Sequence, residues 1–328
     1  MHADVLALQP PRRVLVLGGS GFIGRHAVAA LLAAGCEVTI GSRHPRRIGR
    51  RVPELSARCR HLHCRLERMT GAASWDAALA GCDVVVNCVG ILRQRLRETY
   101  ARVHVQAPAA LAQACRARGI RLLHVSALGL HADARSRFLR SKLAGEEAMR
   151  ASGADWYIVR PSLLDGDGGY GARWLRRIAR WPIHALPGDA TGRIAALHVA
   201  DLGEALAAIA LAPRRDVPED DRIIELGGLA SWCLADYVAA IRSGYSATPA
   251  IRWAVPSLLA RMTSHVCDLL HATPFSFGHW ELLRRDNCPR INQLPAWLGR
   301  EPRTIGSALD ASSWPHEPVV PEPGRSFA

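Results

Sequence analysis

The chain has 328 residues and a formal net charge of +13, with 42 arginine and lysine side chains against 29 carboxylates. Hydrophobic residues make up 49% of it and charged residues 22%, a globular composition that argues against intrinsic disorder. The sequence shows no membrane-spanning apolar run, no signal-peptide pattern and no disulfide framework among its nine cysteines. We therefore expect a soluble protein that is cytoplasmic or peripheral on the inner face of a membrane, with a preference for anionic partners.

Short apolar runs alternate with helical patterns through the first half of the chain. Strands are expected at 13–17, 37–40, 59–64, 83–88, 121–126 and 156–160, and helices at 22–34, 74–80, 99–118 and 137–151. The strands are continuous apolar runs, which is typical of parallel strands buried on both faces. The predicted fold class is α/β, a Rossmann-type doubly wound parallel sheet with helices on both faces.

The second half has a weaker pattern. A glycine-rich loop at 165–171 precedes a helix at 172–181, a strand at 194–198 and a helix at 201–211; further on, a strand at 223–226 and helices at 234–241 and 257–270 are expected. We divide the chain into an N-terminal extension (1–11), a Rossmann domain (12–213), a small α-rich C-terminal region over the ligand crevice (214–313) and an extended or disordered tail (314–328). The tail carries four prolines in fifteen residues.

A glycine-rich turn follows the first strand directly and opens the first helix. Gly18, Gly21 and Gly24 form G-x-x-G-x-x-G, which allows a tight turn, a close backbone approach to a pyrophosphate and close helix–strand packing. The unpaired N–H groups of the helix N-terminus add a partial positive charge. This arrangement predicts a dinucleotide site, and the contacts expected from the turn are Gly18, Ser20, Gly21, Phe22, Ile23 and Gly24.

The end of the second strand indicates which dinucleotide is bound. NAD sites usually have a carboxylate there, but this strand ends in Ile40-Gly41-Ser42-Arg43. A guanidinium at Arg43 and a hydroxyl at Ser42 suit a 2′-phosphate, so NADP(H) is preferred and NAD(H) stays possible. Arg46 and Arg47 would deepen the positive field. The alternative is a solvated basic loop.

The order of these motifs resembles that of the short-chain dehydrogenase/reductase superfamily. The segments that carry the resemblance are GGSGFIGRH, VVVNCVGIL, VSALG, FLRSKLAGEEAMRASG and WYIVRPS. More narrowly, they and the later RDN at Arg285–Asn287 are similar to an atypical or extended branch, the NADPH-binding accessory subunits of respiratory complex I and their bacterial relatives, which belong among epimerase/dehydratase-like proteins. The resemblance spans about residues 12–300 and is strongest through residue 165.

The resemblance implies roles for several further residues. Ser126 and Lys142 take the places of the superfamily's catalytic serine and lysine, and Lys142, whose ammonium binds the nicotinamide ribose, is the only lysine in the chain. Asn87 and Gly90 match the stretch beside the adenosine ribose, and Pro161 lies where the carboxamide end of the cofactor is held. Near the adenine, only Glu67 offers the acidic residue common in the family.

Phe138 stands where the superfamily has its catalytic tyrosine. Phenylalanine has no ionisable proton and cannot act as a general acid. Either the dinucleotide is structural or regulatory, or the protein is an NADPH-dependent reductase or isomerase of an apolar carbonyl substrate, in quinone or lipid metabolism, with a substitute acid. Residues considered as that acid are His131, Arg135, Tyr157 and Tyr170.

Three other patterns bear on partners. The Cys and His residues at 59–64 alternate along an expected strand and do not converge, so no metal site is predicted. The basic run at 43–51 lacks interleaved aromatic residues and does not favour nucleic acid. The amphipathic segment at 255–277 is either a helix that caps the crevice or packs on the sheet, or an interfacial helix or quinone-adjacent surface that the positive charge would draw to anionic lipid. A respiratory or quinone-related complex is the other partner considered.

Overall fold

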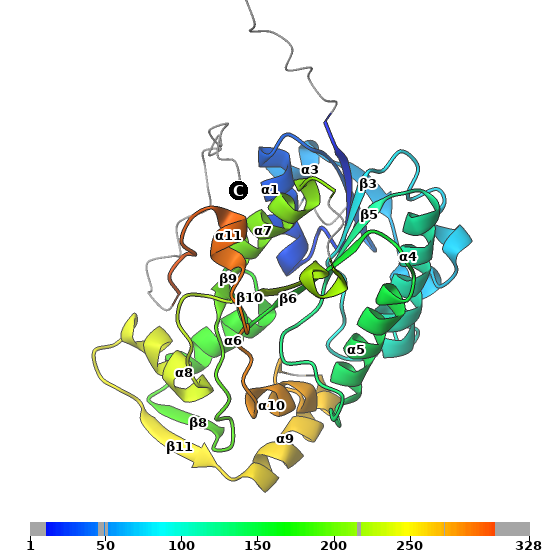
Figure 1. Ribbon diagram of the computed structural model, residues 1–328. Helices are drawn as coiled ribbons and strands as arrows, with labels where there is room; N and C mark the ends of the chain where they lie inside the picture. Colours follow the sequence, from blue (N-terminus) through cyan, green and yellow to red (C-terminus); the bar gives the residue numbers. More distant parts are fainter. Residues whose placement is uncertain (1–10, 45–48, 50–51, 215–217, 272, 306–328) are drawn as a thin grey trace, which may run out of the picture.

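A seven-stranded parallel sheet forms the centre of the protein (Figure 1), with the order β10-β6-β5-β4-β1-β2-β3. This computed structural model describes residues 11–44, 49, 52–214, 218–271 and 273–305. The predicted Rossmann-type fold is confirmed. The strands of the sheet are β1 (Arg13–Leu17), β2 (Glu37–Ser42), β3 (Arg60–His63), β4 (Val84–Asn87), β5 (Arg121–Val125), β6 (Trp156–Pro161) and β10 (Ile223–Leu226).

Helices cover both faces of this sheet because its central strands present apolar side chains on both sides. Every residue of β4 and β5 is buried. One face packs on α1 (Phe22–Ala33), α7 (Val199–Leu211) and α11 (Leu294–Leu298). The other packs on η3 (Ala72–Trp75), the π-helix η4 (Ala101–Gln106), α4 (Ala107–Ala117) and α5 (Arg137–Arg150). Short elements complete this part: α3 (Pro53–Ala57), η2 (Leu66–Arg68) and η5 (Glu219–Arg222).

A smaller unit lies at the end of the molecule that is lowest in Figure 1. Its core joins α6 and α8 to the strand β8, which pairs in parallel with β11. The elements are α6 (Tyr170–Ala179), β8 (Ile183–Pro187), α8 (Leu234–Ser243), β11 (Ile251–Val255), α9 (Ser257–Leu270) and α10 (Phe277–Leu283), and the two-stranded ladder of β7 (Leu164–Asp165) and β9 (Leu197–His198) lies between the units. None of the described helices has the length and apolarity to cross a bilayer.

The chain passes between the two units more than once. β8 comes from the segment expected to belong to the Rossmann domain, whereas β10 comes from beyond residue 213 and is an edge strand of the large sheet. The division at residue 213 stays a prediction about domains, and residues 1–10 and the tail from 306 lie outside the described residues.

Two expected helices differ in the structure. The helix expected at 74–80 is wrong: η3 is a single 3₁₀ turn followed by turns that bury Trp75 and Leu79, since so short a segment gains few α-helical hydrogen bonds. The helix expected at 99–118 begins with six π-helical residues, η4, before α4. The sequence analysis did not expect α3, β8, β11, α10 or α11.

α5 crosses η4 at very short range. A Cβ atom built at Gly145 of α5 would lie 2.0 Å from the carbonyl oxygen of His104 in η4. Only glycine permits this approach, because backbone cannot give way as a flexible side chain can. Gly145 therefore sets the position of α5 against the sheet.

We expect Gly145→Ala to lower the free energy of unfolding by about 2 kcal/mol, since the overpacking outweighs the gain in helix propensity. Gly71→Ala is the matched control, because a Cβ there meets nothing within 4 Å. Urea unfolding measures both. Equal stability of the two variants would contradict the packing argument.

Candidate functional site

The glycine turn between β1 and α1 has the geometry of a backbone cradle. Gly18 has a φ of +73°, and its N–H donates to the Gly41 carbonyl oxygen at 2.8 Å. A Cβ at Gly24 would lie 2.2 Å from the carbonyl oxygen of Gly18. The first turn of α1 is thus pressed against the end of β1, which no residue with a side chain at position 24 allows.

The N-terminus of α1 is prepared for an anion. Gly21 is its N-cap, no side chain caps the helix, and no acidic residue lies in its first turn. Unpaired N–H groups and the helix dipole both favour a phosphate at such an end. The residues present therefore fit the pyrophosphate of a dinucleotide. Ile23 packs on the core, and a Cβ at Gly169 would lie 2.8 Å from the ring of Phe22, so the loop before α6 lies against this end of α1.

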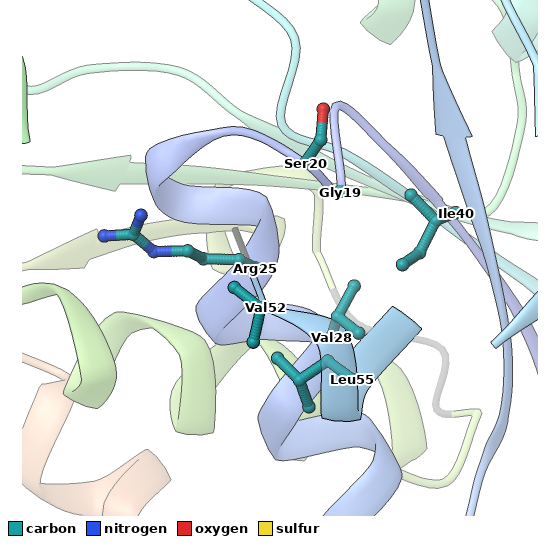
Figure 2. Close-up of a pocket in the computed structure, with 7 residues that line it drawn as sticks. All are labelled: Gly19, Ser20, Arg25, Val28, Ile40, Val52 and Leu55. Atoms are coloured by element: carbon teal, nitrogen blue, oxygen red, sulfur yellow. The ribbon is translucent and has the colours of Figure 1, made fainter. Parts of the chain in front are cut away.

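A small cavity lies behind the glycine turn (Figure 2). Gly19 and Ser20 border it, together with Arg25 and Val28 of α1, Ile40 of β2, and Val52 and Leu55 at α3. Its volume of about 10 Å³ is about that of one water molecule.

The end of β2 brings two hydroxyls and a guanidinium together. The hydroxyl oxygens of Ser20 and Ser42 are 3.0 Å apart, and the His44 N–H donates to the Ser42 oxygen at 3.2 Å. Arg43 is half exposed and forms an ion pair with Glu98. Glu98 is a contact that the sequence analysis missed, because 55 residues separate it from Arg43. Arg46 and Arg47 lie outside the described residues.

Glu67 lies after β3, in η2, with a buried side chain. Arg65 donates to its carboxylate at 2.7 Å. Burial acts to raise the pKa of Glu67, but a hydrogen bond from its own backbone N–H and the Arg65 guanidinium outweigh it and lower the pKa. Glu67 is thus a charged carboxylate already paired to a neighbour.

Asn87 is part of the sheet interior. It is fully buried, its side-chain amide lies 3.1 Å from His124 Nδ1, and its side-chain oxygen accepts from the Val89 N–H. Burial, aided by the Lys142 charge, lowers the pKa of His124 to about 3. Asn87 therefore orders the turn after β4, and a Cβ at Gly90, in that turn, would lie 3.9 Å from His104 Nε2.

His104 in η4 links this turn to α5. The Ile91 N–H donates to His104 Nε2 at 3.1 Å, so Nδ1 carries the proton and donates to Ser141 Oγ at 2.8 Å. Ser141 in turn donates to the carbonyl oxygen of Phe138 at 2.7 Å. Burial, followed by the Lys142 charge, lowers the pKa of His104 to about 2. Sequence reasoning missed this neutral histidine; the π-helical turn that holds it is typical of functional sites.

Lys142 lies on α5 close to both histidines. Burial lowers its pKa to about 8, against a smaller opposite effect of Glu146. That carboxylate is held by Arg160, which donates to it from two nitrogens, one at 3.1 Å. No hydrogen bond or ion pair within the described residues engages the Lys142 ammonium.

The ring of Phe138 packs among three other aromatic side chains. Its ring centroid lies 6.1 Å from that of Tyr100, 5.8 Å from His104 and 6.1 Å from His279 of α10. Tyr100 donates its hydroxyl proton to the Leu92 carbonyl oxygen at 2.6 Å, and burial raises its pKa to about 12. Because its hydroxyl proton is donated to a backbone carbonyl, Tyr100 does not stand in for the tyrosine hydroxyl that Phe138 lacks.

Polar atoms without a partner gather at the carboxyl ends of β5 and β6. They are Ser126 Oγ, both ring nitrogens of His131 and Asn287 Oδ1, all buried. A Cβ at Gly129 would lie 3.5 Å from the Asn287 amide carbon. The RDN segment thus reaches the loop after β5. Unpartnered buried polar atoms are costly unless a ligand or water binds them.

The neighbouring loops fix this region in place. The Leu128 N–H donates to the carbonyl oxygen of Pro161 at 3.0 Å. The Ser162 hydroxyl donates to the backbone carbonyl oxygen of Asn287 at 2.6 Å. Glu281 of α10 accepts the backbone N–H groups of Arg135 and Ser136 at 2.7 and 2.8 Å. The smaller unit therefore holds the start of α5, a contact invisible in the sequence.

Of the four side chains considered as a substitute acid, three are poorly placed. Tyr157 pairs with Leu123 in the sheet, and the Arg121 guanidinium lies 5.1 Å from its ring, toward the amino ends of the strands. The side chains of Arg135 and Tyr170 are exposed. His131 alone combines burial with free ring nitrogens.

Comparisons with known proteins agree with this geometry. Residues 18–180 match the family model described as NAD(P)H-binding. The match covers just under half of the chain and agrees with the NAD(P)H-binding domain that the sequence predicts. It is 33% identical to "Ceramide reductase" of Caulobacter vibrioides over 61% of each chain. It is 32% identical to mouse "NADH dehydrogenase [ubiquinone] 1 alpha subcomplex subunit 9, mitochondrial" over 46% of this chain and 40% of that protein. In both cases the aligned part is less than two thirds of the relative's own length.

Solved structures show the same fold at low identity. A nucleoside-diphosphate-sugar epimerase from Staphylococcus aureus superposes with a TM-score of 0.66 at 17% identity, covering 90% of this chain and 98% of the other. A UDP-glucose 4-epimerase from Bifidobacterium longum, in complex with NAD⁺ and UDP, gives 0.63 at 16% identity over 92% and 96%. The fold is thus that of the NAD-dependent epimerases and dehydratases.

The single lysine allows its pKa to be measured directly. With lysine labelled by ¹³C at Cε, the folded protein should show one side-chain resonance that titrates near pH 8, and the urea-unfolded chain one near 10.5. Between these values the unfolded chain binds the extra proton, so the stability of the wild type should rise with pH relative to that of Lys142→Met. A folded midpoint near 10.5 would contradict the desolvation of this ammonium.

Proposed function

We propose that this protein binds NADP(H) as a structural or regulatory group. The observation that carries the proposal is the pairing of an intact glycine cradle and an unpartnered Lys142 ammonium with Phe138 at the tyrosine position. When bound, the nicotinamide offers a hydride. Reduction of a carbonyl also needs a proton on its oxygen, which Phe138 has no group to supply.

The residues proposed to hold the dinucleotide divide by its parts. The glycine turn and the start of α1 bind the pyrophosphate, Asn87 and Gly90 order the backbone beside the adenosine ribose, and Lys142 donates to the nicotinamide ribose. Ser126 and Pro161 lie beside the nicotinamide. With a pKa of about 8, Lys142 is protonated in most molecules at neutral pH.

The preference for the phosphorylated form rests on Arg43. Its guanidinium and the Ser42 hydroxyl offer donors to a 2′-phosphate where no carboxylate accepts ribose hydroxyls. Glu98 is a competing anion for the same guanidinium. The 2′-phosphate would thus displace Glu98 from one of the N–H groups of the Arg43 guanidinium.

A second function is favoured by one relative and by one side chain. The similarity to a protein named ceramide reductase supports reduction of an apolar carbonyl in lipid metabolism. His131, buried with both ring nitrogens free, is the substitute acid for this function. The similarity to subunits of mitochondrial NADH dehydrogenase supports, for the first function, a respiratory complex as partner.

The nucleotide released from gently purified protein tests the proposal. We expect stoichiometric NADP(H) by mass spectrometry. A preparation that holds no nucleotide and shows no affinity for either dinucleotide would contradict both functions.

Titrations with NADPH and NADH test Arg43. In Arg43→Ala the loss of charged hydrogen bonds of about 1.5–3 kcal/mol should weaken NADPH binding roughly 10- to 100-fold and leave NADH nearly unchanged. Glu98→Gln should strengthen NADPH binding, because the neutral amide no longer competes for the guanidinium. Arg13→Ala, an exposed arginine of β1 paired with Asp83, is the control. Equal losses for both dinucleotides would exclude the phosphate contact.

Turnover separates the two functions. With a long-chain aliphatic ketone as probe, we expect no steady oxidation of NADPH by the wild type. Steady oxidation that falls roughly 100-fold or more in His131→Asn would instead establish the second function, since general acids contribute about that much. His265→Asn, which changes an exposed histidine of α9, is the matched control.

A further inference from the structure

α9 is amphipathic, but its apolar face points away from the protein. Six large apolar side chains form what we call the outward face, each between 52% and 79% exposed: Leu258, Leu259, Met262, Val266, Leu269 and Leu270. The side of α9 that packs on the protein carries the small residues Ala260 and Ser264, which are 2% and 0% exposed. Surface helices of globular proteins normally show the reverse.

This orientation is held by polar contacts. Arg93, in the loop after β4, donates to Asp268 of α9 at 2.9 Å and to the carbonyl oxygens of Thr273 and Phe275 at 2.7 and 2.6 Å. The Arg93 side chain is only 9% exposed. Asp268 also accepts the Phe277 N–H at 2.9 Å. Turning the apolar face inward would break this buried network.

The neighbouring strands continue the apolar surface. In β11, Ile251 and Trp253 are 69% and 63% exposed, and Ile251 pairs with Ile183 of β8, which is 48% exposed. Paired residues of parallel strands lie on one face of the ladder. β11 leads directly into α9, and both lie at the same end of the molecule (Figure 1).

The segments that contribute this surface and lead into it carry a net positive charge. Segments 170–190 and 243–275 contain six arginines and two carboxylates, Asp189 and Asp268. Both carboxylates are engaged by arginines from outside these segments, Arg284 and Arg93. Among the described residues, the exposed side chains of Arg173, Arg177 and Arg261 have no carboxylate partner.

From this surface we infer that the protein docks on an anionic lipid membrane through the outward face of α9. Leucine-rich helices with tryptophan nearby and arginine at the margin insert their apolar side chains at the headgroup boundary, while the cations meet anionic headgroups. A bilayer accepts a helix that turns a row of apolar side chains outward. The inference does not depend on the bound dinucleotide.

Sedimentation with vesicles tests the inference on the full chain. We expect binding to phosphatidylcholine vesicles that contain phosphatidylglycerol, much weaker binding to phosphatidylcholine alone, and a decrease with added salt. Leu258→Ser with Leu269→Ser should weaken binding roughly 100-fold, about tenfold for each leucine. Arg177→Gln with Arg261→Gln should remove the preference for anionic vesicles.

Ile291→Ser is the matched control, because Ile291 is 77% exposed but lies outside the surface. A cooperative urea-unfolding transition like that of the wild type checks that each variant is folded. Binding that is equal for both vesicle types, or unchanged in the double leucine variant, would overturn the inference. So would a wild-type dimer in analytical ultracentrifugation that the leucine variant loses, with no vesicle binding, since the outward face would then join two copies of the chain.

Discussion

The close approach of α1 to β1 is the constraint on which the rest of this site depends. The Gly18 carbonyl oxygen occupies the space that a side chain at position 24 would need, so the first turn of the helix lies directly over the end of the strand. Its free N–H groups then point where a phosphate can meet both the backbone and the helix dipole. Because all seven strands run parallel, the other carboxyl ends and their loops open at this same edge.

At the opposite end of the candidate site, α5 carries Lys142 but has Phe138 where the superfamily that the sequence resembles has a tyrosine. Lys142 is desolvated and without a partner, while the position one turn earlier is an aromatic ring packed among Tyr100, His104 and His279. A partly desolvated ammonium next to two neutral histidines gains from an acceptor that binds it. Ribose hydroxyls would be such acceptors whether or not a hydride is transferred. Binding and turnover are thus separable in this site.

The smaller unit serves the larger one in two ways. Glu281 accepts the N–H groups at the start of α5, and the RDN segment carries Asn287 to the loop after β5, so this unit completes the edge where a substrate would lie. The same unit turns the apolar side of α9 outward. If that surface meets a membrane, the carboxyl edge of the sheet comes near a source of apolar molecules, which suits both proposed functions.

Much of this protein follows from local patterns. The spacing of the glycines predicts the tight turn, because only glycine fits positions without room for a Cβ atom. Continuous apolar runs predict buried parallel strands. The single lysine and the phenylalanine four residues before it are visible in the sequence itself. The sequence by itself determined the fold class, predicted NAD(P)H binding at the glycine turn, and placed a phenylalanine where the resembled superfamily has a tyrosine. It left the amphipathic segment at 255–277 with two readings, and it missed η4.

Only the tertiary structure decided which distant groups meet. Glu98 pairs with Arg43 across 55 residues, Glu281 reaches Ser136 across 145, and Arg93 fixes the outward rotation of α9 through Asp268 across 175. No spacing in the sequence encodes these pairs, because they depend on how loops pack once the sheet has formed. The physical reason is that periodicity reports which face of a helix is apolar, whereas the direction of that face is set by the contacts that hold the helix.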